Sequence, residues 1–267
     1  MIYYRISDNS YPKMKLPGTN KEFCLSNFIR CFGQEKTVVI ADNCKPETIK
    51  MVQAHYGEIV ETNLSNAGSL SYALYNALAL PDEEVVFFVE DDYLHREGLN
   101  LMQIIKEGLE KSDYVTLYDH PDKYQSEYEF GEISQVCKTK STHWRQTTST
   151  CMTFASTAKQ LKEDAKVWEK YTRDTHPQDH KIFTTLAKKL LVSIPGLAFH
   201  TDLTYPLQKN MVDKMIEPWV YEYMEKELDG TNLPREKEFE GFRRLMLLDA
   251  HYLMKQKNRL SIKTSGF

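Results

Sequence analysis

The chain has 267 residues with 34 basic and 38 acidic side chains, so its formal net charge is −4. A hydrophobic fraction of 41% and a charged fraction of 27% are ordinary for a globular protein and exclude a disordered tail or a peptide-sized module. No run approaches the roughly 20 apolar residues of a membrane helix, and residues 1–16 carry charges and prolines where a secretory signal would be apolar. The slightly acidic balance argues against broad nucleic-acid binding, although a local basic patch would still permit it.

Five cysteines indicate a protein with reduced thiols. Their number is odd, and no two of them have the C-x-x-C spacing. A disulfide framework and a zinc ribbon are therefore not expected, and we expect buried thiols and a cytoplasmic location. The residues concerned are Cys24, Cys31, Cys44, Cys137 and Cys151.

The first part of the chain alternates strand-like and helix-like segments. Apolar and β-branched runs predict strands at Ile2–Ile6, Thr37–Ala41, Glu58–Glu61, Val85–Val89 and Tyr114–Leu117. The segments between them predict helices from Pro46 to about Gly57, over Leu70–Leu80 and over Gly98–Lys111. This β-α-β-α-β order predicts an α/β fold with a mixed, mostly parallel central sheet and helices on both faces.

The second part of the chain predicts a different arrangement. Two segments rich in Ser, Thr and Val predict antiparallel strands at Ile133–Thr139 and His143–Phe154. Helices are predicted over Ser156–Tyr171 and from His176 to about Leu190, and a short apolar segment, Leu191–Phe199, ends at His200. Two further helices are predicted at Met211–Leu228 and about Arg235–Leu260, and a small basic tail at Lys255–Lys263.

Glu90, Asp91 and Asp92 form an acidic triplet directly after the most apolar predicted strand. Adjacent carboxylates repel one another and raise one another's pKa unless a cation lies among them. In α/β sheets, ligands bind beyond the carboxyl ends of the strands. A carboxylate cluster at this position therefore favours a Mg²⁺ or Mn²⁺ site that carries a phosphorylated ligand over a solvated acidic turn that caps the next helix.

The order of a strand, Asp42, Asn66-x-Gly68, an apolar strand and an acidic triplet resembles the family 2 glycosyltransferases, which have the GT-A fold. In that family the apolar strand ends in a D-x-D-like motif. The corresponding residues here are Glu90-Asp91-Asp92, with glutamate in place of the first aspartate. The resemblance covers about residues 1–205 and implies a nucleotide-sugar-binding and catalytic domain there. Residues 206–267 would then be a C-terminal helical region that serves as an acceptor platform, a lid or an oligomer contact.

The resemblance also assigns roles to individual residues. It implies that Asp92 binds the divalent cation that bridges the diphosphate, and that Asp91 or Glu90 lies near the ribose or the donor sugar. Positions implied to contact the nucleotide are Arg5 and Ser7 after the first strand, Asp42 after the second, and Asn66 and Gly68 at a helix start. An Asn at a helix start is also an ordinary N-cap, so the order of these positions carries the prediction.

Two residues beyond the triplet complete the predicted site. Asp179 looks like the carboxylate that, in inverting members of the family, deprotonates the acceptor hydroxyl from a helix N-terminus. The alternative is that Asp179 only complements the helix dipole. His200 is similar to a late histidine that many GT-A enzymes place on the metal or the diphosphate, and the alternative is an ordinary loop histidine. His176 and His180 have the spacing of a metal-binding pair, but Pro177 places His176 before the helix.

The residues and the resemblance together predict a glycosyltransferase that uses Mn²⁺ or Mg²⁺. It would move a sugar, with inversion, from a nucleoside diphosphate donor, by default a UDP-sugar, to an acceptor hydroxyl. The acceptor would be a glycan, a glycolipid or a hydroxymethylated base of viral DNA, and the last is supported only by Arg145 and the basic tail. Two alternatives stay open. One is a sugar-1-phosphate nucleotidylyltransferase, which usually has a Gly-rich basic loop that this chain lacks. The other is a carbohydrate- or nucleotide-binding module that binds Ca²⁺ without turnover.

Overall fold

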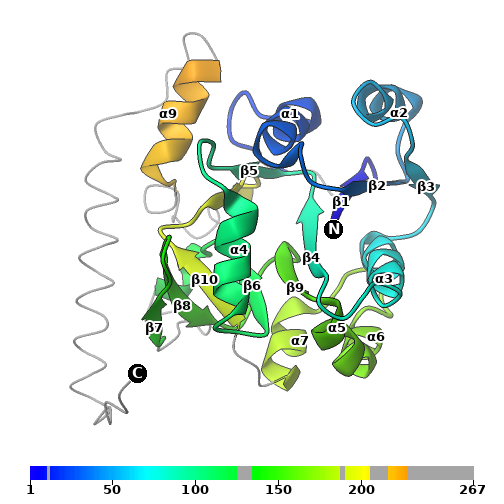
Figure 1. Ribbon diagram of the computed structural model, residues 1–267. Helices are drawn as coiled ribbons and strands as arrows, with labels where there is room; N and C mark the ends of the chain where they lie inside the picture. Colours follow the sequence, from blue (N-terminus) through cyan, green and yellow to red (C-terminus); the bar gives the residue numbers. More distant parts are fainter. Residues whose placement is uncertain (11–12, 125–133, 187–189, 205–215, 228–267) are drawn as a thin grey trace.

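The computed structural model describes residues 1–10, 13–124, 134–186, 190–204 and 216–227. Within these ranges a nine-stranded sheet has helices on both faces, and a two-stranded sheet lies beside it (Figure 1). Of the helix predicted at Met211–Leu228, the structure describes α9 (Pro218–Glu227). The predicted helix Arg235–Leu260 and the basic tail lie outside the described residues.

The first half of the large sheet is parallel. In the order β3-β2-β1-β4, each strand pairs in parallel with its neighbour. The strands are β1 (Ile2–Ser7), β2 (Thr37–Asp42), β3 (Val60–Thr62) and β4 (Val85–Glu90). The strands predicted in this part are therefore confirmed, with β3 shifted towards the C-terminus.

The second half of the sheet mixes parallel and antiparallel pairs. β9 (Phe154–Thr157) lies antiparallel between β4 and β6 (Tyr114–Thr116). β10 (Leu190–Ile194) runs parallel to β6, and a hairpin of β8 (His143–Thr147) and β7 (Val136–Lys138) completes this edge. The predicted antiparallel pair in the middle of the chain is thus confirmed as β7 and β8.

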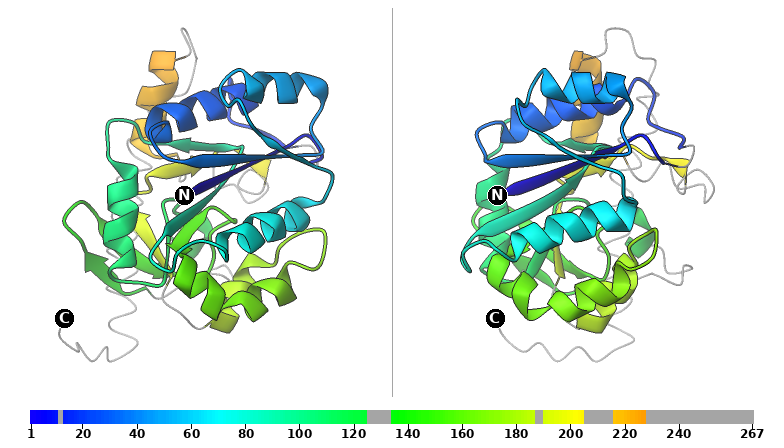
Figure 2. Two further views of the ribbon diagram at one scale, coloured as in Figure 1. Left: turned by 45° about the vertical axis from the view of Figure 1, so that its right-hand side comes forward. Right: turned by 90° about the vertical axis from the view of Figure 1, so that its right-hand side faces the viewer.

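Helices cover the two faces of the sheet in separate groups. One face carries α1 (Lys21–Phe32), α2 (Pro46–Gln53) and α4 (Leu101–Leu109), whose buried side chains belong to one hydrophobic cluster. The other face carries α3 (Asn66–Ala77), α5 (Ala158–Glu163), α6 (Ala165–Tyr171) and α7 (Asp179–Leu186), which share a second cluster. Figure 2 shows α1 and α2 above the sheet and α3 with the helices that follow β9 below it. The predicted α/β fold class is confirmed.

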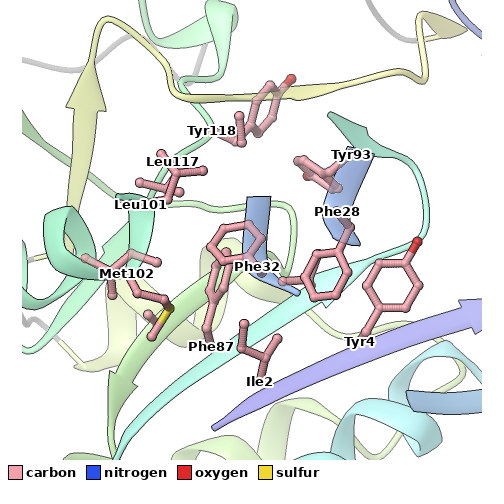
Figure 3. Close-up of a cluster of buried hydrophobic side chains, with 14 of the residues drawn as sticks. Ile2, Tyr4, Phe28, Phe32, Phe87, Tyr93, Leu101, Met102, Leu117 and Tyr118 are labelled. Atoms are coloured by element: carbon pink, nitrogen blue, oxygen red, sulfur yellow. The ribbon is translucent and has the colours of Figure 1, made fainter. Parts of the chain in front are cut away.

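Aromatic side chains hold β1 and β4 together against α1 (Figure 3). Tyr4 on β1 packs on Phe28 of α1, with ring centroids 4.6 Å apart. Phe32, one turn further along α1, packs on Phe87 of β4 at 5.5 Å. All four rings are at most 1% exposed, and burying a side chain of this size contributes about 1.5–3 kcal/mol. This core therefore fixes the positions of the two strand ends.

The small sheet consists of β5 (Tyr93–His95) and β11 (Ala198–His200), which pair antiparallel just beyond the end of β4. The sequence did not predict β5, whereas β11 is the short strand predicted to end at His200. The expected apolar segment Leu191–Phe199 is divided into β10 and β11, with a cis Ile194–Pro195 bond between them. Side chains of α9 pack with those of α1, β5 and β11 in a third hydrophobic cluster, so α9 covers the small sheet.

Three predictions of secondary structure are corrected. The helix α1 was not expected, although Asn20 caps it by accepting the Phe23 N–H at 2.9 Å. The expected strand His143–Phe154 ends at Thr147, because Cys151 and Met152 have positive φ angles of 47° and 59° that a strand does not adopt. The expected helix Ser156–Tyr171 begins only at α5 and is interrupted at Asp164, whose carboxylate accepts the Tyr114 hydroxyl at 2.8 Å.

The five cysteines all lie in the described ranges, and none of them forms a disulfide, as their odd number predicted. Among the residues that the structure describes, no helix has both the length and the apolar character needed to cross a membrane.

Candidate active site

The acidic triplet lies where the strand order of the sheet reverses. β1 lies between β2 and β4 in the sheet. The chain after β1 continues to β2 on one side, and the chain after β4 continues to strands on the other side. Arg5 on β1 is in register with Glu90, the last residue of β4. The crevice at the carboxyl ends of two such strands is the usual ligand site of an open α/β sheet. The structure thus brings the triplet and the end of β1 together, as predicted.

Glu90 is paired with Arg5, whose Nη2 lies 2.5 Å from Glu90 Oε1. The same guanidinium donates through Nη1 to the carbonyl and side-chain oxygens of Asn66, at 2.8 and 3.0 Å, and to Ser69 Oγ at 3.1 Å. Burial raises the pKa of Glu90, and Arg5 opposes that rise. Arg5 is 5% exposed, and its contacts tie β1, β4 and α3 into one unit.

Asp91 lies between the backbone of β1 and the start of α1. Its Oδ2 accepts the Ser7 N–H at 3.2 Å and lies 4.0 Å from Lys21 Nζ. Lys21 is also 3.0 Å from Asp8, so its ammonium group serves two carboxylates. Burial and the neighbouring charge of Asp92 raise the pKa of Asp91 to about 6.

Asp92 is the most buried of the three carboxylates, at 1% exposed. Its Oδ2 lies 2.6 Å from Lys13 Nζ and 3.3 Å from His200 Nε2. Burial opposes the charge of Asp92, but His200 and Lys13 outweigh burial and hold the pKa of this carboxyl well below its usual range. Lys13 Nζ is also 3.9 Å from Asp202 Oδ2. Each carboxylate of the triplet therefore has a cation of its own.

Backbone pairing brings these distant residues to Asp92. His200 on β11 is in register with Tyr93 on β5, the residue after Asp92. The Thr201 N–H then donates to the Asp92 carbonyl at 2.8 Å, and Lys15 forms an antiparallel bridge with Asp202. The segment that contains Lys13 is thus held against the residues that follow β11.

The side chains around the triplet line a cavity of about 80 Å³. The predicted residues that line it are Arg5, Ser7, Asn66, Glu90, Asp91 and Asp92, and residues outside the prediction include Lys13, Ser69 and His176. A site for a larger ligand has about 300–1,000 Å³. A nucleotide would therefore enter only after side chains around the cavity have moved.

Asp42 is buried away from this cavity. Its Oδ1 accepts the Thr62 hydroxyl at 2.8 Å and the Leu64 N–H at 2.6 Å, and its Oδ2 accepts the Asn43 amide at 2.9 Å. The side chain is 2% exposed. In the structure Asp42 therefore holds the end of β2 to the segment after β3.

Gly68 lies in the first turn of α3, where the chain passes close to Leu64. A Cβ atom on Gly68 would lie 2.9 Å from Leu64 Cβ, so this close approach requires glycine. The N–H of Gly68 donates to the Ser65 side chain at 3.1 Å, and the N–H of Ala67 donates to the Thr175 carbonyl at 3.0 Å. Asn66 and Ser69 of this turn line the cavity.

Asp179 is the first residue of α7, as predicted for a helix N-terminus. Its Oδ2 accepts the N–H groups of Thr150 and Cys151 at 3.3 and 3.1 Å, and its Oδ1 accepts the His180 N–H at 2.6 Å. The Cys151 carbonyl accepts the Tyr93 hydroxyl at 3.3 Å. Asp179 is thus connected through one loop to the residue that follows Asp92. His176 lies before α7, as Pro177 indicated, so His176 and His180 do not form a pair on one helix.

Sequence reasoning missed three residues next to the triplet: Lys13, Lys21 and Asp202. The available signal was the basic character of the segment after the first strand. No sequence pattern pairs Lys13 with a carboxylate 79 residues further along the chain. Likewise, Asp202 reaches the site only because β5 and β11 pair.

The residues around Asp92 include a second carboxylate, Asp202, and a histidine, His200. In the described ranges no group of three His, Cys, Asp or Glu side chains is already arranged to hold a metal ion. Asp92 and Asp202 instead face the ammonium group of Lys13, and His200 lies 3.3 Å from Asp92. Carboxylate oxygens and an imidazole nitrogen are donors that Mn²⁺ accepts. Asp92 Oδ1 is buried and has no hydrogen-bond partner among the described residues. The donor types would suit a divalent cation, and in this structure the Lys13 ammonium group lies beside two of them.

No protein-family model and no curated protein sequence matches the chain. Solved structures that are similar to it include residues 1–349 of S. aureus TarS, which are 16% identical, with 99% of this chain and 75% of that chain covered and a TM-score of 0.45. The galactosyltransferase LgtC, in complex with donor and acceptor sugar analogues, is 14% identical, with 72% and 73% covered and a TM-score of 0.43.

The 4-diphosphocytidyl-2C-methyl-D-erythritol synthase of Anaerococcus prevotii is also similar. It is 14% identical, with 79% of this chain and 94% of the synthase covered and a TM-score of 0.43. The similar structures thus include glycosyltransferases of the GT-A fold, as the sequence resemblance implied, together with nucleotidyltransferases.

Proposed function

We propose that this chain is a glycosyltransferase that moves a sugar from a nucleoside diphosphate donor, by default a UDP-sugar, to an acceptor hydroxyl. The observation that carries the proposal is the acidic triplet at the carboxyl ends of β1 and β4, where each carboxylate faces a separate cation. A crevice at this point of an open α/β sheet takes ligands. Carboxylates interleaved with basic groups suit a phosphorylated ligand that arrives with its own cation.

Two lysines are the cations best placed to contact the diphosphate. The side chains of Lys13 and Lys21 are 17% and 26% exposed. Arg5 is more deeply buried and already donates to Glu90, Asn66 and Ser69. We therefore assign Arg5 to the support of the crevice and the two lysines to the phosphates.

The proposed chemistry assigns one role to the metal and one to a base. Asp92 and His200, with Asp202, would hold Mn²⁺ or Mg²⁺, which stabilises the negative charge that develops on a leaving diphosphate. Asp179 is the proposed general base for the acceptor hydroxyl, and three backbone N–H groups orient its carboxylate. Attack from the face opposite to the leaving group inverts the anomeric carbon. The acceptor is proposed to be a glycan or glycolipid, with a hydroxymethylated DNA base as the other choice.

A donor screen tests the proposal. UDP-, GDP- and TDP-sugars are titrated into the protein with and without Mn²⁺, and at least one is expected to bind more tightly with the metal. Asp92→Ala should abolish this metal-dependent binding. Asp82→Ala is the matched control, because Asp82 is an exposed carboxylate paired with Lys162 before β4 begins. The absence of binding by every nucleotide sugar in both conditions would overturn the proposal.

A second variant separates binding from transfer. Asp179→Asn should leave donor binding unchanged and lower transfer by about 10²-fold or more, the usual effect of losing a general base. Normal transfer by this variant would show that the base is another group. Consumption of a nucleoside triphosphate with a sugar 1-phosphate would instead identify a nucleotidylyltransferase, and binding without any turnover would identify a binding module. A DNA acceptor should make binding depend steeply on salt.

A further inference from the structure

The ammonium group of Lys13 lies inside a set of metal-type donors. Its Nζ is 2.6 Å from Asp92 Oδ2 and 3.9 Å from Asp202 Oδ2, and His200 Nε2 is 3.3 Å from the same oxygen of Asp92. Asp92 and Asp202 are 1% and 6% exposed. Two nearly buried carboxylates therefore converge on one monovalent side chain.

Lys13 and His200 both face the same oxygen of Asp92, Oδ2, at 2.6 and 3.3 Å. Asp92 Oδ1 is buried without a hydrogen-bond partner among the described residues, and a buried acceptor of this kind calls for a bound ion or water. A divalent cation would match both carboxylate charges and can use both oxygens of one carboxylate.

Lys13 is able to leave the cluster without unfolding its surroundings. Its backbone neighbours are anchored, because the Leu16 N–H donates to the Thr201 carbonyl at 2.8 Å and the Met14 N–H donates to Thr204 Oγ1 at 2.9 Å. Its side chain remains 17% exposed and has four flexible bonds. A rotation of the side chain into solvent would thus open the space among the donors while the backbone stays in place.

We propose that Lys13 is a built-in competitor for the divalent cation. Its ammonium group lies against Asp92 and Asp202, beside His200, and a divalent cation enters only as Lys13 withdraws and turns towards a phosphate. The metal therefore binds weakly when no nucleotide sugar is present. Its affinity rises when a phosphorylated ligand draws Lys13 away. The identity of the phosphorylated ligand rests on the proposed function. The competition between Lys13 and the cation does not.

The test uses Mn²⁺ alone, titrated calorimetrically into the full chain with no nucleotide present. Lys13→Ala and Lys13→Met remove the competing charge and should bind Mn²⁺ at least about tenfold more tightly than the wild type. Lys13→Arg restores the cation and should bind Mn²⁺ weakly again. Circular dichroism and thermal melting of each variant show that it is folded, and Lys13→Met retains the apolar stem in case the alanine variant is unstable.

Lys21→Met is the matched control, because Lys21 lies at the same acidic triplet but faces Asp8 and Asp91. It removes the same charge and should change the affinity for Mn²⁺ by less than about threefold. Equal tightening by Lys21→Met would overturn the competition, as would a Lys13 variant that binds Mn²⁺ no better than the wild type or not at all. The Mn²⁺ titration can support the competition even if no nucleotide sugar binds. Conversely, unchanged Mn²⁺ affinity in the Lys13 variants would not contradict binding of a nucleotide sugar.

Discussion

The ends of β2 and β4 each carry a buried carboxylate, and the structure uses the two differently. Asp42 is 2% exposed, and both of its oxygens accept hydrogen bonds from neutral groups near the end of β3. Asp92 is 1% exposed, faces Lys13 and His200 with one oxygen, and leaves its other oxygen without a hydrogen-bond partner in the described part of the chain. Asp42 ends β2 and Asp92 lies two residues beyond β4, but only Asp42 has hydrogen bonds from described residues to both of its carboxylate oxygens.

Stability measurements test this contrast with the largest expected effect. Asp42→Ala leaves the Leu64 N–H and the Thr62 hydroxyl without their acceptor, so the free energy of unfolding should fall by about 3 kcal/mol. Asp92→Ala should lower it by less, because the partly exposed Lys13 can turn to solvent when its partner is removed. Urea denaturation of both variants gives the comparison. An equal fall in the free energy of unfolding for Asp92→Ala and Asp42→Ala would show that Asp92 is also a structural residue.

A third carboxylate, Glu217, is partly buried and forms no ion pair with another described residue, which sharpens the contrast. Its Oε1 accepts the Gly196 N–H at 3.0 Å, and burial together with the charge of Asp119 raises its pKa to about 7. The folded chain therefore holds this proton more tightly than the unfolded chain, whose glutamates titrate near about pH 4.3. The stability contributed by the protonated form is complete below that pH and is lost as the pH rises through about 7.

The expected loss between pH 4.5 and 8 is roughly 3 kcal/mol, from a pKa rise of about 2.5 units. Glu217→Gln retains an acceptor for Gly196 and cannot ionise, so this variant should lack the loss and be more stable than the wild type at pH 8. Denaturation midpoints at several pH values check this. Parallel pH profiles for the variant and the wild type would contradict the assigned burial of this carboxyl.

The smallest expected effect concerns the turn that positions Asn66. Gly68→Ala places a Cβ atom 2.9 Å from Leu64 Cβ, so it should destabilise the protein by about 1–2 kcal/mol. Gly57→Ala is the control, because nothing lies within 4 Å of a Cβ at that position. It should be neutral or stabilise by up to about 1 kcal/mol through the unfolded chain. Equal effects from the two substitutions would show that the approach of Leu64 does not explain Gly68.

The sequence predicted the parts of the fold that depend on local pattern. Continuous apolar runs predicted β1, β2 and β4, and the strand-end rule placed Glu90, Asp91 and Asp92 at the edge where ligands bind. The interruption of the helix at Asp164 was not predictable, because it depends on a hydrogen bond to Tyr114, which lies 50 residues away in the chain.

Two cations of the site, Lys13 and Lys21, were not predicted for the same reason. Like charges in the triplet correctly indicated that a cation must lie nearby, and the sequence favoured a metal ion. The structure places Arg5, Lys21 and Lys13 beside the three carboxylates. These contacts form only when β1 pairs with β4 and when β11 pairs with β5, and no spacing in the sequence specifies the second pairing.

The central claim is that a nucleotide sugar binds at the end of β4 and not at the end of β2. The most direct measurement is titration of the preferred nucleotide sugar, with Mn²⁺, into the wild type, Asp92→Asn and Asp42→Asn, each first confirmed to be folded. Asp92→Asn should weaken donor binding by about a hundredfold or more, whereas Asp42→Asn should change it by less than about threefold. Equal loss of binding in both variants, or no binding of any nucleotide sugar by the wild type, would contradict the account.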